Sequence, residues 1–311
     1  MKPTTRSYYR DAVRDAVRTI VASLDSALDL DGLARGAATS EFHFHRVFRG
    51  MIGETPLELH RRLRLERAAR ALAFTDHTVS RIAADAGYET HAAFTRAFGA
   101  AFGMAPVTFR AEARCGDHPS WVPRCLLTAR SGVHYTDQGV AWEDLYTTDE
   151  GQNMDVTVRT LEPLRVAYTP HRGSYHTISD AFARLGGIAG QAGLIGPGSK
   201  MLAVFHDDPE ITPEPELRSE AAISVGDTAL IPSGLEERVL PGGPHAVTMH
   251  IGPYSTLGDT WSRLMGQWLP ASGHRLAEGV SYEVYLNMPG QVPEQDLRTE
   301  LHIPLEAATD D

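Results

Sequence analysis

The sequence has few cysteines and no long apolar run. Its two cysteines, Cys115 and Cys125, cannot build a disulfide framework or a four-thiolate zinc site. Nowhere do 18 apolar residues run together, so no segment is expected to cross a bilayer as a helix. The first twenty residues carry charged side chains throughout, unlike the apolar stretch of a secretory signal. We therefore expect a cytoplasmic protein without membrane contact.

Basic residues are outnumbered in the whole chain, but they are concentrated at its start. The 311 residues hold 29 Lys and Arg against 40 Asp and Glu, a net charge of −11. Residues 1–114 hold 17 against 13, a net charge of +4, and the remainder holds 12 against 27, or −15. The length allows two domains, of which the first suits phosphate better than the second. Charge alone favours nucleic acid only weakly, because +4 over 114 residues is ordinary surface.

The first part contains an internal repeat with an offset of fifty residues. Arg46-Val47-Phe48 recurs as Arg96-Ala97-Phe98, and Gly53-Glu54-Thr55-Pro56 recurs as Gly103-Met104-Ala105-Pro106. A fixed offset kept at several positions indicates that one supersecondary unit occurs twice. Each copy predicts a short helix, a tight turn and a second helix, which is a helix-turn-helix unit. The predicted helices span 31–37 and 40–50, then 79–86 and 90–102, with Ser40 and Thr90 as N-caps.

A longer helix is predicted between the two units. Residues 57–74 have helical spacing of apolar side chains and no Pro or Gly. At 1.5 Å per residue this rod is roughly 25 Å long, comparable to the turn of DNA, about 34 Å, that separates successive major grooves. Both second helices could then enter the major groove on one face of the DNA.

This arrangement resembles the AraC family, in which a long helix joins two helix-turn-helix units that bind DNA. The specific match is the second unit, Ile82 to Glu89, followed by Phe94 to Phe98 and Gly103 to Pro106. The resemblance covers about residues 11–112, and we assign residues 1–112 to this domain. Its place at the N-terminus is similar to the Rob-like branch of the family.

The second helix of each unit is expected to bury its aromatic residues and to present the others to DNA. The resemblance implies DNA contacts for Phe42, His45, Arg46, Arg49, His91, Ala92 and Arg96. An arginine can bond O6 and N7 of guanine together, whereas a phosphate contact would add affinity without specificity. His43 and His45 are not predicted to bind metal, because side chains two apart on a helix point to different sides.

Residues 113–153 show no clear helical or alternating pattern, and we treat them as a connector. Trp121, Tyr135, Trp142 and Tyr146 make this segment too aromatic for a freely disordered linker. We therefore expect it to pack on one of the two domains.

The second part is also a repeat. His171-Arg172-Gly173-Ser174-Tyr175 recurs as His250-Ile251-Gly252-Pro253-Tyr254, an offset of 79 that later becomes 80. Each copy predicts a β-rich run, a helix and two strands. The order β-α-β-β, twice, predicts one antiparallel sheet with two helices on one face and a groove along the pseudo-twofold axis. The expected fold class is α+β with two domains, an all-α double helix-turn-helix domain followed by this duplicated domain.

The duplicated pattern resembles the GyrI-like domain over about residues 154–306. The turn Leu161-Glu162-Pro163, the paired His-x-Gly-x-Tyr and the run Tyr282 to Leu286 carry the match. The resemblance implies the effector-binding module of Rob-like and BmrR-like multidrug regulators, which takes amphipathic, often cationic aromatic molecules. We therefore expect a transcription regulator whose partners are operator DNA, a small-molecule effector and RNA polymerase.

The repeat breaks at Glu283, which corresponds to Ala203 in the first copy. Strand alternation places Glu283 and Tyr285 on one face, where a carboxylate beside aromatic rings can take a cation. The family pattern places its ligand-binding glutamate here, although an acidic residue on a strand is usually just solvated. The predicted ligand-binding residues are Glu283, Tyr285, Tyr254, Tyr175, Trp261 and Trp268.

Two alternatives remain open at the level of sequence. Some proteins with GyrI-like domains resemble small-molecule hydrolases, in which Glu283 would serve as a base. Others bind protein, as gyrase inhibitors of this type do. The sequence shows no nucleophile elbow, phosphate-binding glycine loop or zinc signature, so we expect no catalytic residue, cofactor or metal.

Overall fold

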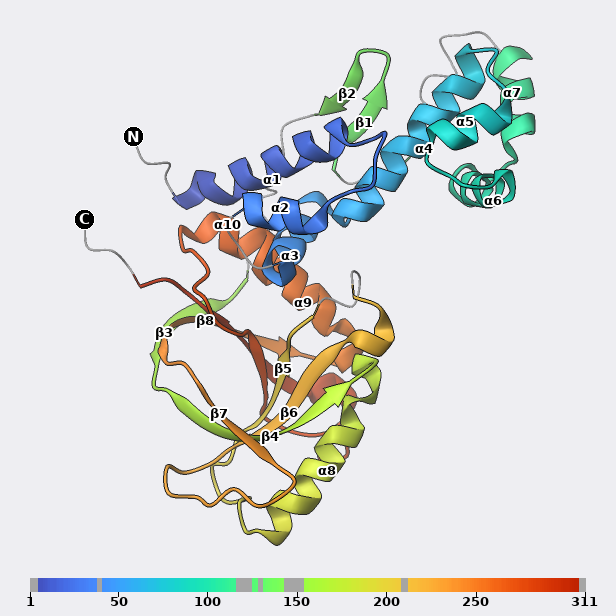
Figure 1. Cartoon of the computed structure of the whole chain (residues 1–311). Helices are drawn as coiled ribbons and strands as arrows, with labels where there is room; N and C mark the ends of the chain where they lie inside the picture. Colours follow the sequence, from blue (N-terminus) through green and yellow to red (C-terminus); the bar gives the residue numbers. More distant parts are fainter. Residues whose placement is uncertain are drawn as a thin grey trace. The chain divides into compact units, whose positions relative to one another are not determined.

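The computed structural model describes residues 5–37, 41–115, 125–127, 131–142, 154–207 and 212–307. The chain divides into two compact units, Tyr8–Thr147 and Thr148–Asp311, the latter together with Met1–Ser7. The first is mainly helical, and the second is a sheet with helices (Figure 1). None of the helices in the described ranges is long and apolar enough to cross a membrane.

The helical unit contains both predicted helix-turn-helix pairs. The first pair is α2 and α3, the second is α5 and α6, and α4 joins them (Figure 1). The bounds are α1 Thr5–Ala22, α2 Leu30–Gly36, α3 Glu41–Ile52, α4 Pro56–Phe74, α5 Val79–Asp85, α6 His91–Phe102 and α7 Pro106–Cys115. The predicted helices are confirmed to within two residues at each end.

Caps and glycines explain where these helices begin and end. The Thr90 hydroxyl accepts a hydrogen bond from the Ala93 amide at 3.2 Å and starts α6 as predicted, whereas Ser40 lies outside the described residues. Thr55 and Glu58 form a reciprocal capping box at the start of α4. Gly53 and Gly103, one in each copy, follow α3 and α6 with φ of 84° and 73°. This left-handed conformation favours glycine, which accounts for its recurrence in the repeat.

A β-hairpin follows the helices and was not predicted. It consists of β1 (Val133–Thr136) and β2 (Gly139–Trp142), paired antiparallel. From the sequence, these residues are expected to form a connector, because they show no clear helical or alternating pattern. The structure instead places β1 against α4, within the helical unit.

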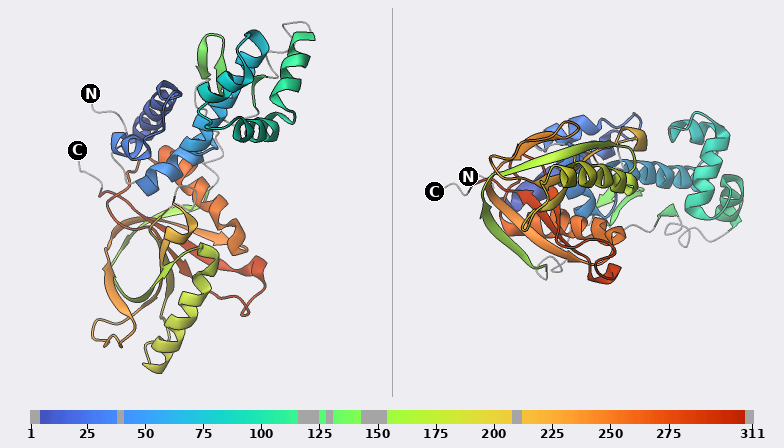
Figure 2. Two further views of the ribbon diagram at one scale, coloured as in Figure 1. Left: turned by 45° about the vertical axis from the view of Figure 1, so that its right-hand side comes forward. Right: turned by 90° about the horizontal axis from the view of Figure 1, so that it is seen from below.

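The second unit is one antiparallel sheet of eight strands in the order β3-β8-β10-β9-β5-β6-β4-β7. Figure 2 shows this sheet curling, with its helices outside the curl. The strands are β3 Val156–Leu161, β4 Leu164–Arg172, β5 Met201–Phe205, β6 Arg218–Ser224, β7 Glu236–Leu240, β8 Gly243–Ile251, β9 Tyr282–Tyr285 and β10 Arg298–Pro304. The helices are α8 Ile178–Gln191, α9 Leu257–Arg263 and α10 Leu269–Ser272, with a short π-helix, Leu264–Trp268, between the last two.

The two halves of the sheet exchange their first strands. β3 opens the first half but pairs with β8, and β7 opens the second half but pairs with β4. The repeat is therefore β-β-α-β-β rather than β-α-β-β, because β7 was missed in the second copy. The halves meet where β5 pairs with β9, and there Ala203 lies directly opposite Glu283.

The helices α8 and α9 cover the same face of this sheet, as predicted. The strand registers place Ala221, Ala203 and Glu283 in one row across β6, β5 and β9. α8 packs on the first of these residues, and Trp261 of α9 bonds the last. The opposite face buries a separate apolar cluster that includes Leu202, Tyr282 and Val284. The predicted fold class is confirmed.

Candidate functional site

We call the second helix of each helix-turn-helix unit, α3 and α6, its recognition helix. The recognition helix α6 presents polar and small side chains to solvent. His91, Ala92 and Arg96 are exposed, while Phe94 and Phe98 are fully buried. The two phenylalanines pack together with Ile82 of α5 and Leu72 of α4 in one core cluster. The buried stripe thus fixes the helix so that the predicted DNA-facing residues lie on its outer side.

The first recognition helix, α3, agrees with the predicted DNA-facing set less completely. Arg49 is exposed and Arg46 is partly buried, whereas the side chain of Phe42 lies outside the described part. His45 is only 1% exposed, which differs from its predicted place on the DNA-facing surface, and we leave it out of the proposed contacts. Burial, followed by the charge of Arg46, lowers the pKa of His43 to about 4, so this buried imidazole is neutral at pH 7.

In the second unit, the glutamate at the break in the repeat is held by two aromatic side chains. The indole nitrogen of Trp261 donates to Oε1 of Glu283 at 2.7 Å. The hydroxyl of Tyr285 donates to Oε2 at 2.7 Å. Glu283 is 3% exposed and Trp261 is 5% exposed. Alternation along β9, together with the contact from Trp261 of α9, therefore brings together three of the predicted ligand residues, and each carboxylate oxygen accepts a hydrogen bond.

Further rings surround this carboxylate. Tyr254 and Phe182 both meet the ring of Tyr285 edge-on, with centroids 5.3 and 5.6 Å away. Burial, followed by the charge of Glu283, raises the pKa of both Tyr254 and Tyr285, the latter well above its usual value. The phenols therefore stay neutral donors at physiological pH. Phe182 was not predicted as a ligand residue, because its spacing along α8 is equally typical of core.

Tyr175 and Trp268 make their described contacts elsewhere. The Tyr175 hydroxyl donates to the backbone oxygen of Asp207 at 2.5 Å, and its ring packs on Phe205 at 4.8 Å. Trp268 stacks on His274, with ring centroids 6.1 Å apart. The pair of Tyr175 with Phe205 is the first-half counterpart of Tyr254 with Tyr285. Only the second half adds a carboxylate, so the pseudosymmetry is broken at this site.

Two protein families match the two units. The description "GyrI-like small molecule binding domain" matches residues 154–306, and "Helix-turn-helix domain" matches residues 33–112. No group of three or more potential metal ligands occurs in the ranges that the structure describes.

The curated relatives include a gyrase inhibitor and transcriptional regulators. A DNA gyrase inhibitor of Yersinia enterocolitica is 37% identical over 120 residues, which are 37% of this chain and 75% of that protein. The probable transcriptional regulator YgiV of Escherichia coli K12 is 30% identical over 156 residues, 49% of this chain and 96% of that protein. The HTH-type transcriptional regulator YbfP of Bacillus subtilis, itself uncharacterized, is 34% identical over 103 residues, 33% of this chain and 35% of that protein. The chain therefore belongs to the DNA-binding transcription regulators that join an AraC-type helix-turn-helix domain to a GyrI-like small-molecule-binding domain.

Proposed function

We propose that this regulator senses an amphipathic organic cation, which binds at Glu283, and that binding changes its hold on operator DNA or its contact with RNA polymerase. The observation that carries the proposal is a buried carboxylate bonded by Trp261 and Tyr285. Away from water a carboxylate attracts a cation more strongly, because the surroundings screen the charge less. The faces of neighbouring aromatic rings add a further attraction for the cation.

The burial of Glu283 implies how an effector would enter. Since Glu283 is 3% exposed, a ligand reaches its carboxylate only by displacing side chains that cover it, and we propose that these include Tyr285. Tyr254 is 37% exposed and touches Tyr285, so this ring lies at the solvent side of the cluster. We propose that effector binding moves Tyr254 and Tyr285 and thereby disturbs β9 and the start of α9. Such a displacement is the local event that a regulator needs to couple to DNA binding.

The charge on Glu283 is tested with a matched pair of ligands. The probes are a naphthylmethyl trimethylammonium ion and its neutral neopentyl isostere, each titrated calorimetrically into the full chain. Glu283→Gln keeps the shape and removes the charge, so affinity for the cation should fall about tenfold, or about 1.4 kcal/mol, while that for the neutral isostere changes little. Glu294→Gln, an exposed glutamate of the same unit, serves as the control. Equal affinity of Glu283→Gln for the cation would contradict the proposal.

We propose no enzymatic role for Glu283. Both carboxylate oxygens already accept a hydrogen bond from the protein, which suits a ligand-binding group better than a base aimed at water. The hydrolase alternative has its own signature in the same experiment. Turnover of an ester probe that disappears in Glu283→Gln would favour it over sensing.

For DNA we propose contacts by Phe42, Arg46, Arg49, His91, Ala92 and Arg96, with Arg46 and Arg96 each reading a base. The exposed face of α6 supports this proposal. Arg46→Ala and Arg96→Ala should each weaken binding to a selected operator by about 1–3 kcal/mol and affect random DNA much less. Arg263 is an exposed arginine of the C-terminal sheet unit, and Arg263→Ala is the matched control in the binding assay. Equal losses on operator and random DNA would assign these arginines to phosphate instead.

A further inference from the structure

Three charged residues lie buried along one side of the helix that joins the two helix-turn-helix units. Arg62, Glu66 and Arg70 are 8%, 0% and 6% exposed and follow one another at intervals of four residues on α4. Side chains at this spacing share one helix face. Burying a charge is costly unless it is paired and hydrogen-bonded, so this stripe requires a partner.

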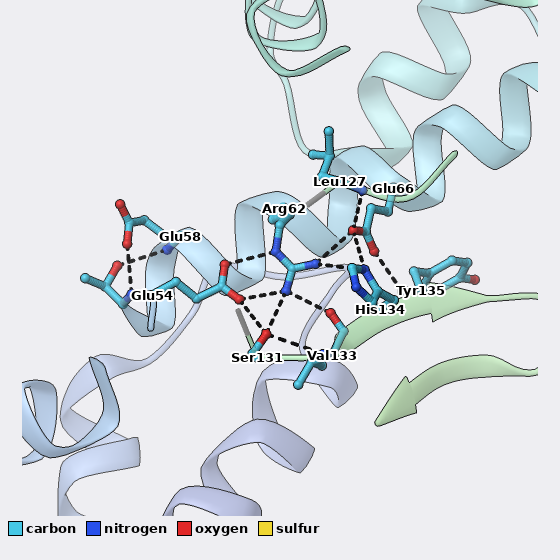
Figure 3. Close-up of polar contacts among 10 residues, drawn as sticks. Glu54, Glu58, Arg62, Glu66, Leu127, Ser131, Val133, His134 and Tyr135 are labelled. Carbon is cyan, nitrogen blue, oxygen red and sulfur yellow. Dashed lines mark hydrogen bonds and ion pairs between the residues drawn. The ribbon is translucent and has the colours of Figure 1, made fainter. Parts of the chain in front are cut away.

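The partner is the segment that was expected to be a connector (Figure 3). Arg62 donates from Nη2 to the backbone oxygen of Val133 at 2.8 Å and to the hydroxyl of Ser131 at 3.3 Å. The same guanidinium forms a two-point contact with Glu54, at 2.6 and 2.9 Å. Ser131 also donates to Glu54 at 3.0 Å, which closes the network.

Glu66 is the centre of the same network. Its carboxylate accepts from the backbone amides of Leu127 at 3.0 Å and Tyr135 at 2.8 Å (Figure 3). His134 lies 2.9 Å away through Nδ1, and Arg62 donates at 2.8 Å. A carboxylate with four such partners is well satisfied even at zero exposure. One turn further along, Arg70 forms an ion pair with Asp137 at the hairpin turn.

This segment touches parts of both helix-turn-helix units. Glu54 lies between α3 and α4, at the end of the first unit. Cys125 is fully buried in the core of the second helix-turn-helix unit, in one cluster with Phe94 and Phe98 of α6. Leu127 and the hairpin residues from Ser131 to Asp137 contact the charged stripe of α4. The segment lies beyond residue 112, where the match to the helix-turn-helix family ends.

We infer that residues 125–127 and 131–142 form a splint on α4 that fixes the spacing and orientation of the two recognition helices. Arg62, Glu66 and Arg70 are then positioning residues for DNA recognition, although they touch no DNA. The two units bind one operator as a linked pair, so the second binding event depends on how well the connecting rod holds its partner in register. Once one helix-turn-helix unit is bound, α4 sets the effective concentration of the other at its half-site. A small bend of α4 would lower that concentration without altering either helix-turn-helix unit.

The test separates spacing from stability and uses the full chain. Three DNA duplexes are compared by fluorescence anisotropy: a selected operator, the operator with one half-site randomised, and the operator with two base pairs inserted between half-sites. Arg62→Met should weaken operator binding about tenfold, yet leave half-site binding within about twofold. The penalty for the insertion should also shrink, because a looser rod tolerates altered spacing. Arg61→Met, an exposed neighbour on α4, is the matched control and should change none of these.

A second variant distinguishes a change in spacing from a loss of folded protein. Asp137 is 73% exposed at the hairpin turn, so Asp137→Ala removes the ion pair with Arg70 by truncating a side chain that is itself at the surface. It should shift the three affinities in the same direction as Arg62→Met, by a smaller factor. If either variant loses operator and half-site binding in parallel, or keeps the full insertion penalty, the splint does not set spacing and the inference is wrong.

Discussion

Gly242 lies where two connections of the sheet pass each other. A Cβ at this position would lie 2.6 Å from the backbone oxygen of Leu161 and 2.7 Å from the backbone nitrogen of Pro163. These atoms belong to the turn from β3 to β4, which cannot move aside without displacing both strands. Gly242→Ala should therefore lower the free energy of unfolding by about 1–3 kcal/mol, measured by urea denaturation of the full chain.

A glycine on α8 provides the opposite control. Gly187 is exposed within the helix, and a Cβ there would meet nothing within 4 Å. Gly187→Ala should raise stability by about 0.5–1 kcal/mol, because alanine restricts the unfolded chain and favours the helix. If Gly242→Ala were as stable as the original protein, the close passage of the two turns would not be a constraint.

The clustering of Glu283, Trp261 and Tyr285 could be anticipated from the sequence, while their role in ligand binding stays a prediction. Glu283 was found because it replaces Ala203 of the first copy, and Trp261 and Tyr285 followed from helix and strand spacing. His45 was assigned to the wrong surface. At about 100° per residue it lies at the edge of the stripe that Phe44 and Phe48 bury, where spacing alone does not decide exposure.

At the level of elements, helices with their own signals were predicted well. The helix-turn-helix pairs carry caps, glycines and apolar stripes within the chain segment itself, and α4 has an unbroken helical pattern. The hairpin of β1 and β2 lacks such a signal, because strands of four residues are stable only through what they pack against. Its support comes from Arg62, Glu66 and Arg70, which are about seventy residues away in sequence.

The missed strand β7 shows a related limit. Its sequence, Glu-Glu-Arg-Val-Leu, is too charged to predict a strand, but charge is common at the edge of a sheet. Arg238 of β7 bonds Glu220 of β6 at 2.8 and 3.0 Å. Burial favours the neutral form of Glu220, but hydrogen bonds and charges from His206 and Arg238 outweigh it and lower the pKa. Arg159 of β3 bonds Glu300 of β10 at 3.3 Å in the same way, so both edge strands are fastened by an equivalent pair.

For the whole molecule, the uneven distribution of charge poses a question about DNA binding. A net charge of −11 predicts repulsion from DNA, and screening by salt would then strengthen binding. Local contacts between arginines and phosphates predict the reverse, because each contact releases a condensed counterion. The two explanations differ in the sign of the salt dependence. The positive charge of +4 in residues 1–114, against −15 in the remainder, favours the local explanation.

We expect the affinity of the full chain for its operator to fall steeply as salt rises, despite its negative net charge. Each phosphate contact contributes about −0.9 to the slope of log K against log salt. If exposed Arg49 contacts phosphate, Arg49→Ala should make that slope less negative by about 1, measured by anisotropy titrations between low and moderate salt. Asp227→Asn, which removes an exposed negative charge from the second unit, should leave the slope unchanged. Binding that strengthens with salt, or an equal change of slope in both variants, would mean that net charge rather than the recognition helices governs the approach to DNA.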